Sequence, residues 1–224
     1  MDNLSHFITG VVVADALPFT KRLGPKAPLI AAIASAAPDA DMIPAFFANF
    51  PPKRLSFDGL FDMNTVHLIH RAYTHSFFYM TLAAIPLAYL AWRWSGRNGK
   101  WLHWFLMLAP AFYLHTILDL TNPWGVRAWL PFSNSRSAFN VLPLIEPFIL
   151  GAAAAVFLVN HVFRDSYPEN PDNPAPLRQP WRQRTADWLN ARIGATTVGV
   201  IGMVLIFGKI AWALITAPTL EHWF

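Results

Sequence analysis

The chain of 224 residues contains no cysteine, which excludes disulfide bonds and metal sites built on thiolates. A bound metal ion would therefore depend on histidine, aspartate and glutamate side chains. Charge is also scarce: only 13% of the residues are charged, whereas 54% are hydrophobic and ten are tryptophan. A soluble domain of this length would carry more charge, so the composition predicts an integral membrane protein.

Other features are missing as well. The lysines and arginines give a net charge of +4 but are too dispersed for a nucleic-acid groove, and they suit contact with anionic lipid. The first six residues lack the basic start of a secretory signal peptide, so insertion is expected to use internal spans. The Gly-x-Ser-x-Gly and His-Glu-x-x-His motifs and glycine-rich phosphate loops are absent from the sequence.

The hydrophobic stretches predict an all-α integral membrane bundle with about four transmembrane helices. Each of four stretches approaches or exceeds the roughly 20 residues that a spanning helix needs. These stretches are Phe77–Trp94, Trp101–Leu120, Val141–Phe163 and Thr196–Ala217. Two shorter apolar pieces, Phe7–Pro18 and Pro28–Pro38, are expected to form short buried or interfacial N-terminal helices.

We expect residues 1–224 to form a single membrane-embedded domain. Its predicted parts are an N-terminal helical lobe over 1–75, three spans over 76–163, a polar proline-rich linker with an interfacial helix over 164–192, and a fourth span with a tail over 193–224.

The stretch from His115 to Asp119 lies at the polar end of a hydrophobic run and carries an imidazole and a carboxylate four residues apart. On an α-helix this spacing places both side chains on one face, about one turn apart. They could hold one cation between them. The alternative is a hydrogen-bonded histidine beside a helix-capping aspartate.

Placing the other histidines and acids on the predicted topology favours the metal site. Eight candidate ligands from five separate segments fall on one side of the membrane: His6, Asp39, Asp41, His70, His75, His115, Asp119 and Glu146. Random placement would distribute them over both ends of the spans. The sequence therefore predicts that these segments converge on a common site.

The spacing of these residues leaves the number of ions open. His70 and His75 are five residues apart, so either the chain turns between them or each binds a different ion. Asp39 and Asp41 would point the same way if the backbone were extended. Imidazole and carboxylate donors suit Zn²⁺, Mn²⁺ or Fe²⁺. We expect one to three divalent ions, zinc first among them.

Four motifs in order carry a family resemblance: the N-terminal Met-Asp-Asn-Leu-Ser-His, Ala-Pro-Asp-Ala-Asp, His-Arg-x-x-Thr-His-Ser, and His-x-x-x-Asp-x-x-Thr-x-x-Gly. Together they resemble the YdjM-type family of bacterial membrane-bound metal-dependent hydrolases over roughly residues 1–150. The family usually has Ile-Asp-Pro near the third span, where this chain has Ile145, Glu146 and Pro147. The His-x-x-x-Asp element is also similar to one in bacterial zinc phospholipase C enzymes.

The resemblance implies a metal-dependent hydrolase of the bacterial inner membrane. We expect a metal-activated water to cleave a phosphoester or ester of a lipid or amphiphile at the membrane interface. Asp41 or Asp39 would serve as general base or bridging ligand. Arg71 is a candidate for binding an anionic phosphate, although it could equally be a surface charge.

Two other classes stay open. A transporter would place its polar groups near the bilayer midplane, where only Lys209 is found. A scaffold with a structural metal would have that ion fully enclosed by protein ligands. The positive-inside rule gives equal counts of basic residues for the two faces, and the density of basic residues in the loops mildly favours a site on the extracytoplasmic face.

Overall fold

The computed structural model describes residues 2–48, 66, 69–163, 185, 187–189 and 193–217, and these form helices and loops without a strand. The prediction of an all-α bundle is confirmed. The proline-rich part of the predicted linker lies outside the described residues.

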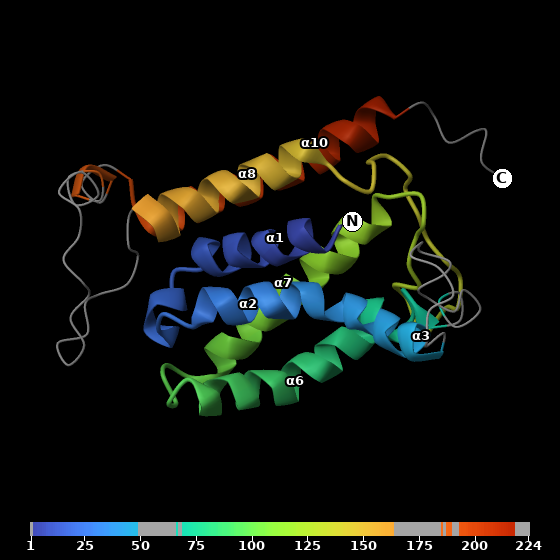
Figure 1. The fold of residues 1–224 in the computed structure, drawn as a ribbon, viewed down its shortest axis with the longest axis horizontal. Coiled ribbons are helices and arrows are strands. Elements are labelled where there is room, and N and C mark those ends of the chain that lie inside the picture. The colour runs from blue at the N-terminus through green and yellow to red at the C-terminus, as the bar shows by residue number, and fades with distance from the viewer. Residues whose placement is uncertain are drawn as a thin grey trace.

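Six longer helices build the bundle, and short helices extend or connect them. The longer ones are α1 (Asn3–Ala16), α2 (Ala27–Ala36), α6 (Phe77–Trp94), α7 (Trp101–Leu120), α8 (Pro147–Phe157) and α10 (Ala195–Thr216). The short ones are the 3-10 helices η1 (Thr20–Leu23), η2 (Ala37–Asp41) and η3 (Tyr73–His75), the helix α3 (Met42–Ala48) and the π-helical turn η4 (Leu158–Phe163). Figure 1 shows α1 and α2 between α6 on one side and α8 with α10 on the other, with α7 crossing obliquely.

Helix α1 is the centre of the bundle, because it contacts α2, α7, α8 and α10. Gly10 makes the contact with α2 possible: a Cβ atom there would lie 2.5 Å from the carbonyl oxygen of Ala31. Gly199 has the same role on α10, where a Cβ atom would lie 2.4 Å from the backbone of Asp15. Small residues at such crossings are typical of helix packing in membranes. The N-terminal helices were expected to be either buried or interfacial. Most residues of α1 and α2 are buried in the bundle.

Three helical stretches among the described residues are long and apolar enough to cross a membrane. They are Ala27–Phe47, Trp101–Leu120 and Ala195–Thr216. The second and third correspond to predicted spans. The first joins α2, η2 and α3, which the sequence analysis divided at Pro38; a proline in the first turn of a new helical segment is compatible with continuation.

The other two predicted spans need correction. Helix α6 has the predicted bounds but, at 18 residues, is less apolar than the three candidates. The third span begins at Pro147 instead of Val141, because Pro147 occupies the first helical position and the Glu146 side chain caps the helix. The apolar helix Pro147–Phe163 is therefore shorter than the expected Val141–Phe163.

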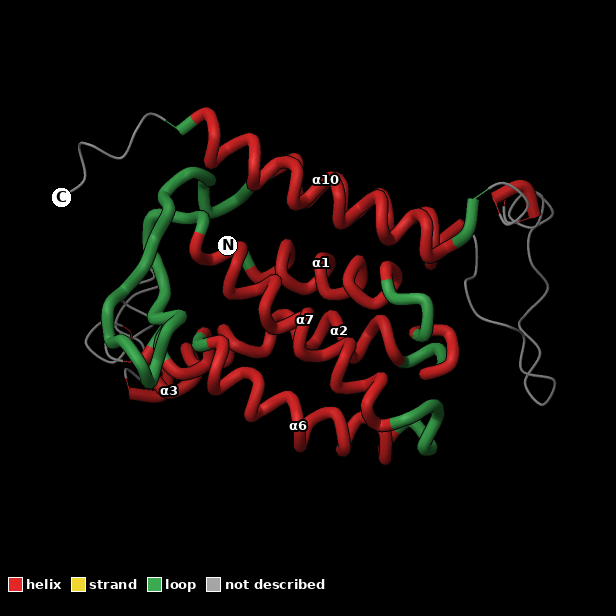
Figure 2. The backbone as a smooth tube through the Cα atoms, turned by 180° about the vertical axis from the view of Figure 1, so that it is seen from behind, coloured by secondary structure: helices red, strands yellow, loops and turns green. Residues whose placement is uncertain are grey.

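The N-terminal segment was described as a lobe, which implied a location at one end of the bundle. Its helices instead run along the length of the bundle. Its helices form a hairpin whose turn, η1, packs against the α6–α7 loop at the end opposite α3 (Figure 1). There Gly99 lies against Leu23, and Lys26 lies over the ring of Trp94 at 5.0 Å from its centroid. The start of α1 and the α2–η2 junction return to the other end, beside the loop after α7 (Figure 2).

Candidate metal centre

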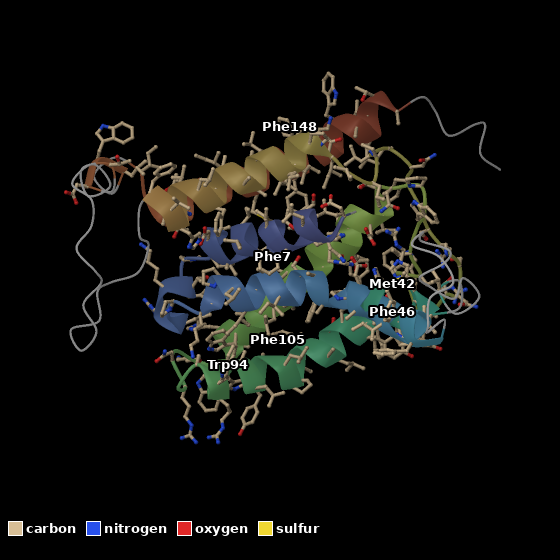
Figure 3. The ribbon with its side chains drawn as sticks, viewed as in Figure 1. Phe7, Met42, Phe46, Trp94, Phe105 and Phe148 are labelled. Carbon is tan, nitrogen blue, oxygen red and sulfur yellow. The ribbon has the colours of Figure 1, made fainter. Side chains whose placement is uncertain are left out.

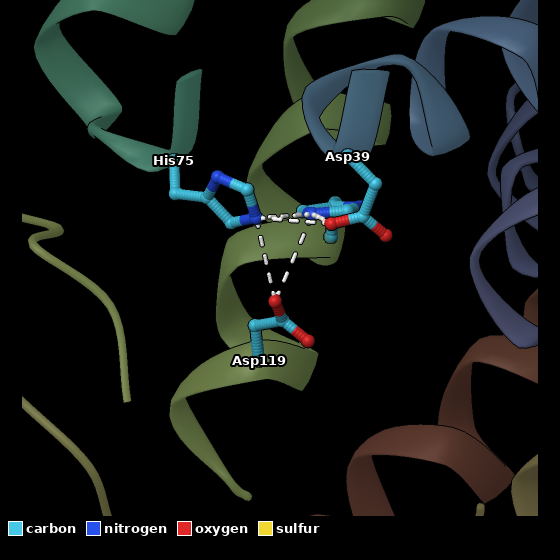
Figure 4. Close-up of side chains that lie close together, drawn as sticks. Asp39, His75 and Asp119 are labelled. Atoms are coloured by element: carbon cyan, nitrogen blue, oxygen red, sulfur yellow. Dashed lines mark hydrogen bonds and ion pairs between the residues drawn. The ribbon is translucent and has the colours of Figure 1, made fainter. Parts of the chain in front are cut away.

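Four of the predicted ligands point at one another at the end of the bundle that carries α3. Asp39 comes from η2, His75 from η3, and His115 and Asp119 from the last turns of α7. One donor atom from each lies within 4.8 Å of all the others. Figure 4 shows Asp39 and His75 facing each other above Asp119. The structure thus brings together donors that are up to 80 residues apart in the sequence.

The spacing of these donors fits one tetrahedral ion. The two histidine Nε2 atoms are 3.0 Å apart. His75 Nε2 lies 3.3 Å from Asp39 Oδ1 and 3.4 Å from Asp119 Oδ2, while His115 Nε2 lies 3.7 and 3.9 Å from the same two oxygens. Donors about 2.0–2.1 Å from zinc at tetrahedral corners are about 3.3–3.4 Å apart. The group therefore fits an N₂O₂ site with small adjustments.

The hydrogen bond of His115 fixes which of its nitrogens can bind an ion. Its Nδ1 lies 2.7 Å from the carbonyl oxygen of Ser35, which can only accept, so Nδ1 carries the hydrogen. The lone pair of the neutral ring is then on Nε2, which faces the group. Metal-binding histidines commonly donate their other N–H to a backbone carbonyl in this way.

His75 is oriented by a comparable chain of hydrogen bonds. The hydroxyl of Thr74 donates to Asp41 Oδ2 at 2.5 Å, so it can only accept from His75 Nδ1, 2.9 Å away. Both Nε2 lone pairs are consequently directed into the same space. Ser76, the next residue, caps α6 by accepting from the backbone N–H of Tyr79. Thr74 thus orients a candidate ligand, and Ser76 fixes the start of the following helix.

The carboxylate of Asp119 is held by groups from two other segments. His6 Nε2 lies 3.3 Å from Asp119 Oδ1, and Asn122 Nδ2 donates to the same oxygen at 3.1 Å. The ring of His6 also stacks on that of His115, with centroids 3.8 Å apart. His6 therefore lies beside the group and supports two of its members instead of supplying one of its four donors.

Arg71 reaches the group from a strained backbone position. Its φ of 61° lies in the left-handed region of backbone conformation, which residues other than glycine rarely adopt. The guanidinium donates to Asn122 Oδ1 at 2.9 Å and lies 3.4 Å from Asp119 Oδ2. Strain of this kind concentrates at functional sites. The residue is 6% exposed, so Arg71 is not the surface charge that the sequence left open.

Charge balance favours a divalent cation in this group. The carboxylates of Asp39, Asp41 and Asp119 are largely buried, and the guanidinium of Arg71 lies 3.4 Å from Asp119 Oδ2. Burial alone would lower the pKa of His75, but its hydrogen bonds to Asp119 and Asp39 and the charges of these carboxylates raise that pKa above its ordinary value. The metal-free group thus attracts a proton to His75. Buried carboxylates that lack such compensation are costly, and a divalent ion would supply it.

Asp41 and His70 form a pair beside the group. His70 Nδ1 lies 2.6 Å from Asp41 Oδ1, and the backbone N–H of Arg71 donates to Asp41 Oδ2 at 3.1 Å. Neither residue is among the four converging donors, and no second group of three or more donors occurs within the described part of the chain. The expectation of one to three ions is thus supported for one ion.

The structure does not bring Glu146 to the metal centre. Its side chain accepts a hydrogen bond from the backbone N–H of Phe148 at the start of α8 and lies 3.7 Å from Lys209 Nζ of α10. Lys209, the charge in the middle of the last span, therefore has a carboxylate partner.

One supporting residue was missed by the sequence analysis. The amide of Asn122, just beyond the end of α7, joins Asp119 to Arg71. Its position three residues after Asp119 was the available signal. The contribution of Ser35 comes from its backbone carbonyl, so no side-chain pattern could indicate it.

We predict that Asp41→Asn will weaken metal binding by about 10–100-fold, the usual effect of removing a partner of a metal-binding histidine. The substitution keeps the shape of Asp41 and removes the charge that orients Thr74 and His75. Competition titration with a chromophoric chelator would measure the affinity. A loss as large as that of His115→Ala would contradict this assignment and make Asp41 a ligand itself.

Comparisons with known proteins agree with the motifs and the fold. The family model described as "YdjM inner membrane protein" matches residues 1–217. No curated protein and no solved structure matches the chain. The similarity to zinc phospholipase C enzymes accordingly stays a prediction.

Proposed function

Because the chain belongs to the YdjM inner membrane protein family, we propose that it is a metal-dependent hydrolase of the bacterial inner membrane that cleaves a phosphoester or ester of a lipid. The observation that carries the proposal is the convergence of Asp39, His75, His115 and Asp119, with both histidine Nε2 lone pairs directed into the group.

These four residues would hold the ion, and zinc is the first candidate because the donors are imidazole and carboxylate at tetrahedral spacing. A bound divalent ion supplies Lewis-acid activation of water and of the scissile ester at neutral pH. The guanidinium of Arg71 would stabilise negative charge on a phosphate. His6 and Asn122 keep Asp119 in place while the substrate binds.

Proton transfer is best assigned to His70, with Asp41 as its orienting partner. Asp41 accepts hydrogen bonds from the backbone N–H of Arg71 and the hydroxyl of Thr74 in addition to its contact with His70. A carboxylate so occupied is a weak base. His70 is 18% exposed at its side chain, so water can reach it. Its Nε2 accepts a hydrogen bond from Arg71 Nε at 3.3 Å, and this contact must open before His70 can take a proton from water or substrate. An aspartate that fixes the tautomer of a histidine base is a common arrangement in hydrolases.

The basic residues support a site on the extracytoplasmic face. The turn η1 lies with the α6–α7 loop, so Lys21, Arg22 and Lys26 share the end of Arg93, Arg97 and Lys100. Among the described residues, the opposite end has only Arg71, Arg127 and Arg136. The described part of the chain thus has six basic residues at the end opposite the candidate metal centre and three at the end that carries it. The positive-inside rule favours the more basic end in the cytoplasm, which supports an extracytoplasmic site.

We predict that alkaline phosphatase fused after Phe224 will be active in cells, and that a fluorescent protein fused there will be dark, since α10 ends on the side of the metal centre (Figure 1). The same reporters inserted after Gly96 should give the reverse result. Activity of the phosphatase at Gly96 instead would place the metal centre in the cytoplasm.

The hydrolase proposal can be tested on the purified full-length protein in micelles. The protein would be stripped with a chelator, refilled with one ion at a time, and assayed on phospholipids labelled at the headgroup or the acyl chain. Hydrolysis that returns with one equivalent of metal supports the proposal. Retention of metal without hydrolysis of either label would reject the catalytic role.

A structural metal site is the second candidate, and one observation favours it: four protein donors already complete a tetrahedral set. Cobalt substitution separates the two candidates. A visible spectrum that changes when inorganic phosphate is added indicates a position open to ligands, whereas an unchanged spectrum indicates a closed structural site.

A further inference from the structure

We infer that the groove between α2 and α6 binds one acyl chain of the phospholipid whose headgroup meets the metal centre. This inference deepens the proposed function and rests on it for the position of the headgroup. It also specifies the substrate as a lipid with a long acyl group, which residues of α2, α6 and α7 would hold.

Two adjoining cavities make up the groove. The first, of about 320 Å³, is lined by residues of η2, η3, α6 and α7, including Pro38, Thr74, Ala83 and Leu87. The second, of about 330 Å³, is entirely apolar in its lining and continues along α2 and α6 to Trp94. Ala37, Leu87 and Phe112 line both, so the two cavities are neighbours along α6.

The groove begins at residues that adjoin two of the four donors. Pro38 precedes the ligand Asp39, and Thr74 hydrogen-bonds the ligand His75. Thr74 and two tyrosines provide the polar groups of the mouth, and every residue beyond it is apolar. A polar mouth beside the ion and an apolar remainder match an amphiphile with its ester at the mouth.

The groove is long enough to take a lipid chain. Its wall on α6 extends from Tyr79 to Trp94, which is about 22 Å at 1.5 Å per residue. One leaflet of the hydrocarbon core is about 15 Å thick. An extended acyl chain therefore fits from the mouth to the far end, where Lys26 lies over Trp94. Figure 3 shows Trp94 at the end of α6 distant from Met42 and Phe46 of α3.

The groove exists because α2 and α6 both pack on α7 without closing on each other. Leu108 and Phe112 of α7 form its floor. Leu87, Leu90 and Trp94 on one wall are 42%, 59% and 63% exposed, so they present apolar surface to whatever fills the groove. In lipid, selection of a chain depends on close packing, because burial gives no hydrophobic gain there.

Photocrosslinking tests the groove independently of hydrolysis. The full-length protein in nanodiscs would receive a trace of phosphatidylglycerol with a diazirine at a defined acyl carbon. Crosslinks on α6 would be mapped by mass spectrometry and divided by those on Val204 of α10, which is 64% exposed and outside both cavities. We expect this ratio to fall at least about tenfold in Ala83→Trp, which fills the first cavity.

Leu87→Trp should remove only crosslinks from diazirines far along the chain, because Leu87 lies where the two cavities join. Ile85→Trp is the matched control: two residues from each of these positions, it projects from the opposite side of α6, is 46% exposed and lines neither cavity.

The outcomes separate the two proposals. Preferential crosslinks without any hydrolysis would keep the groove and reject the enzyme. Hydrolysis without preferential crosslinks, or equal effects of Ala83→Trp and Ile85→Trp, would reject the groove alone. A dimer that dissociates in Ala83→Trp would assign the groove to a second copy of the chain and also overturn the inference.

Discussion

His115→Ala is expected to weaken metal binding and to lower hydrolysis when metal is limiting. Its Nε2 faces three other donors at 3.0 to 3.9 Å. The neighbouring His6 stacks on His115, but its Nε2 is held by Asp119. Structural zinc sites with four ligands bind with about 10–16 kcal/mol, so one ligand contributes roughly 3–4 kcal/mol. The affinity should therefore fall by about 10²–10³-fold. Elemental analysis and chelator competition would measure the loss.

His103→Ala is the matched control for this prediction. His103 lies at the other end of the same helix and stacks on Phe19, with ring centroids 4.8 Å apart. It should keep the metal content of the unsubstituted protein. If His115→Ala still binds one equivalent with unchanged affinity, the four-residue group is not the metal site.

Arg71→Gly is expected to lower kcat for a phosphoester by about 10²–10³-fold at saturating metal, the effect of removing one preorganised donor from an active site. The unfolding temperature of the metal-free protein should fall as well, because Asp119 loses its buried guanidinium partner and Asn122 a hydrogen bond. Glycine adopts the φ of 61° without strain, which offsets only part of this loss. Steady-state kinetics and thermal unfolding of the same preparations would test both expectations.

Arg97→Gly provides the comparison, because Arg97 also has a φ of 61° but lies at the opposite end of the bundle, over the ring of Trp92. It should show the same relief of strain and no loss of kcat. Equal kcat for the two glycine variants would show that the guanidinium of Arg71 does not act in the reaction.

Local spacing in the sequence was informative where a regular helix carries the residues. His115 and Asp119 share a face of α7, as their separation of four residues predicted. The five-residue separation of His70 and His75 left a turn or two different ions as alternatives. The structure has the turn: η3 directs His75 to the other three donors, while His70 pairs with Asp41.

Spacing was uninformative where the local backbone was not known. Asp39 and Asp41 would point the same way only if the backbone were extended. They instead occupy a 3-10 helix, with three residues per turn, so residues two apart point in different directions. Asp39 joins the metal-binding group and Asp41 turns to His70.

Tertiary contacts determined what the sequence could not. Glu146 falls on the predicted side of the membrane, yet the cap of α8 and the charge of Lys209 hold it elsewhere. The turn η1 lies at the far end of the bundle because α1 and α2 pack closely along each other at Gly10. The sequence does not reveal which helix a glycine in an apolar run will contact. A prediction of ligands from the side of the membrane on which residues fall therefore gives too many candidates.

The origin of the donors in η2, η3 and α7 has a consequence for biosynthesis. Asp39 leaves the ribosome 80 residues before Asp119, which at 5–20 residues per second is about 4–16 s. During this interval the hairpin of α1 and α2 is already synthesised while its carboxylates still lack their imidazole partners. Loading of the proposed ion would therefore be a late event of maturation, and a cell deprived of that ion would accumulate full-length chains whose helices are inserted but whose centre is incomplete.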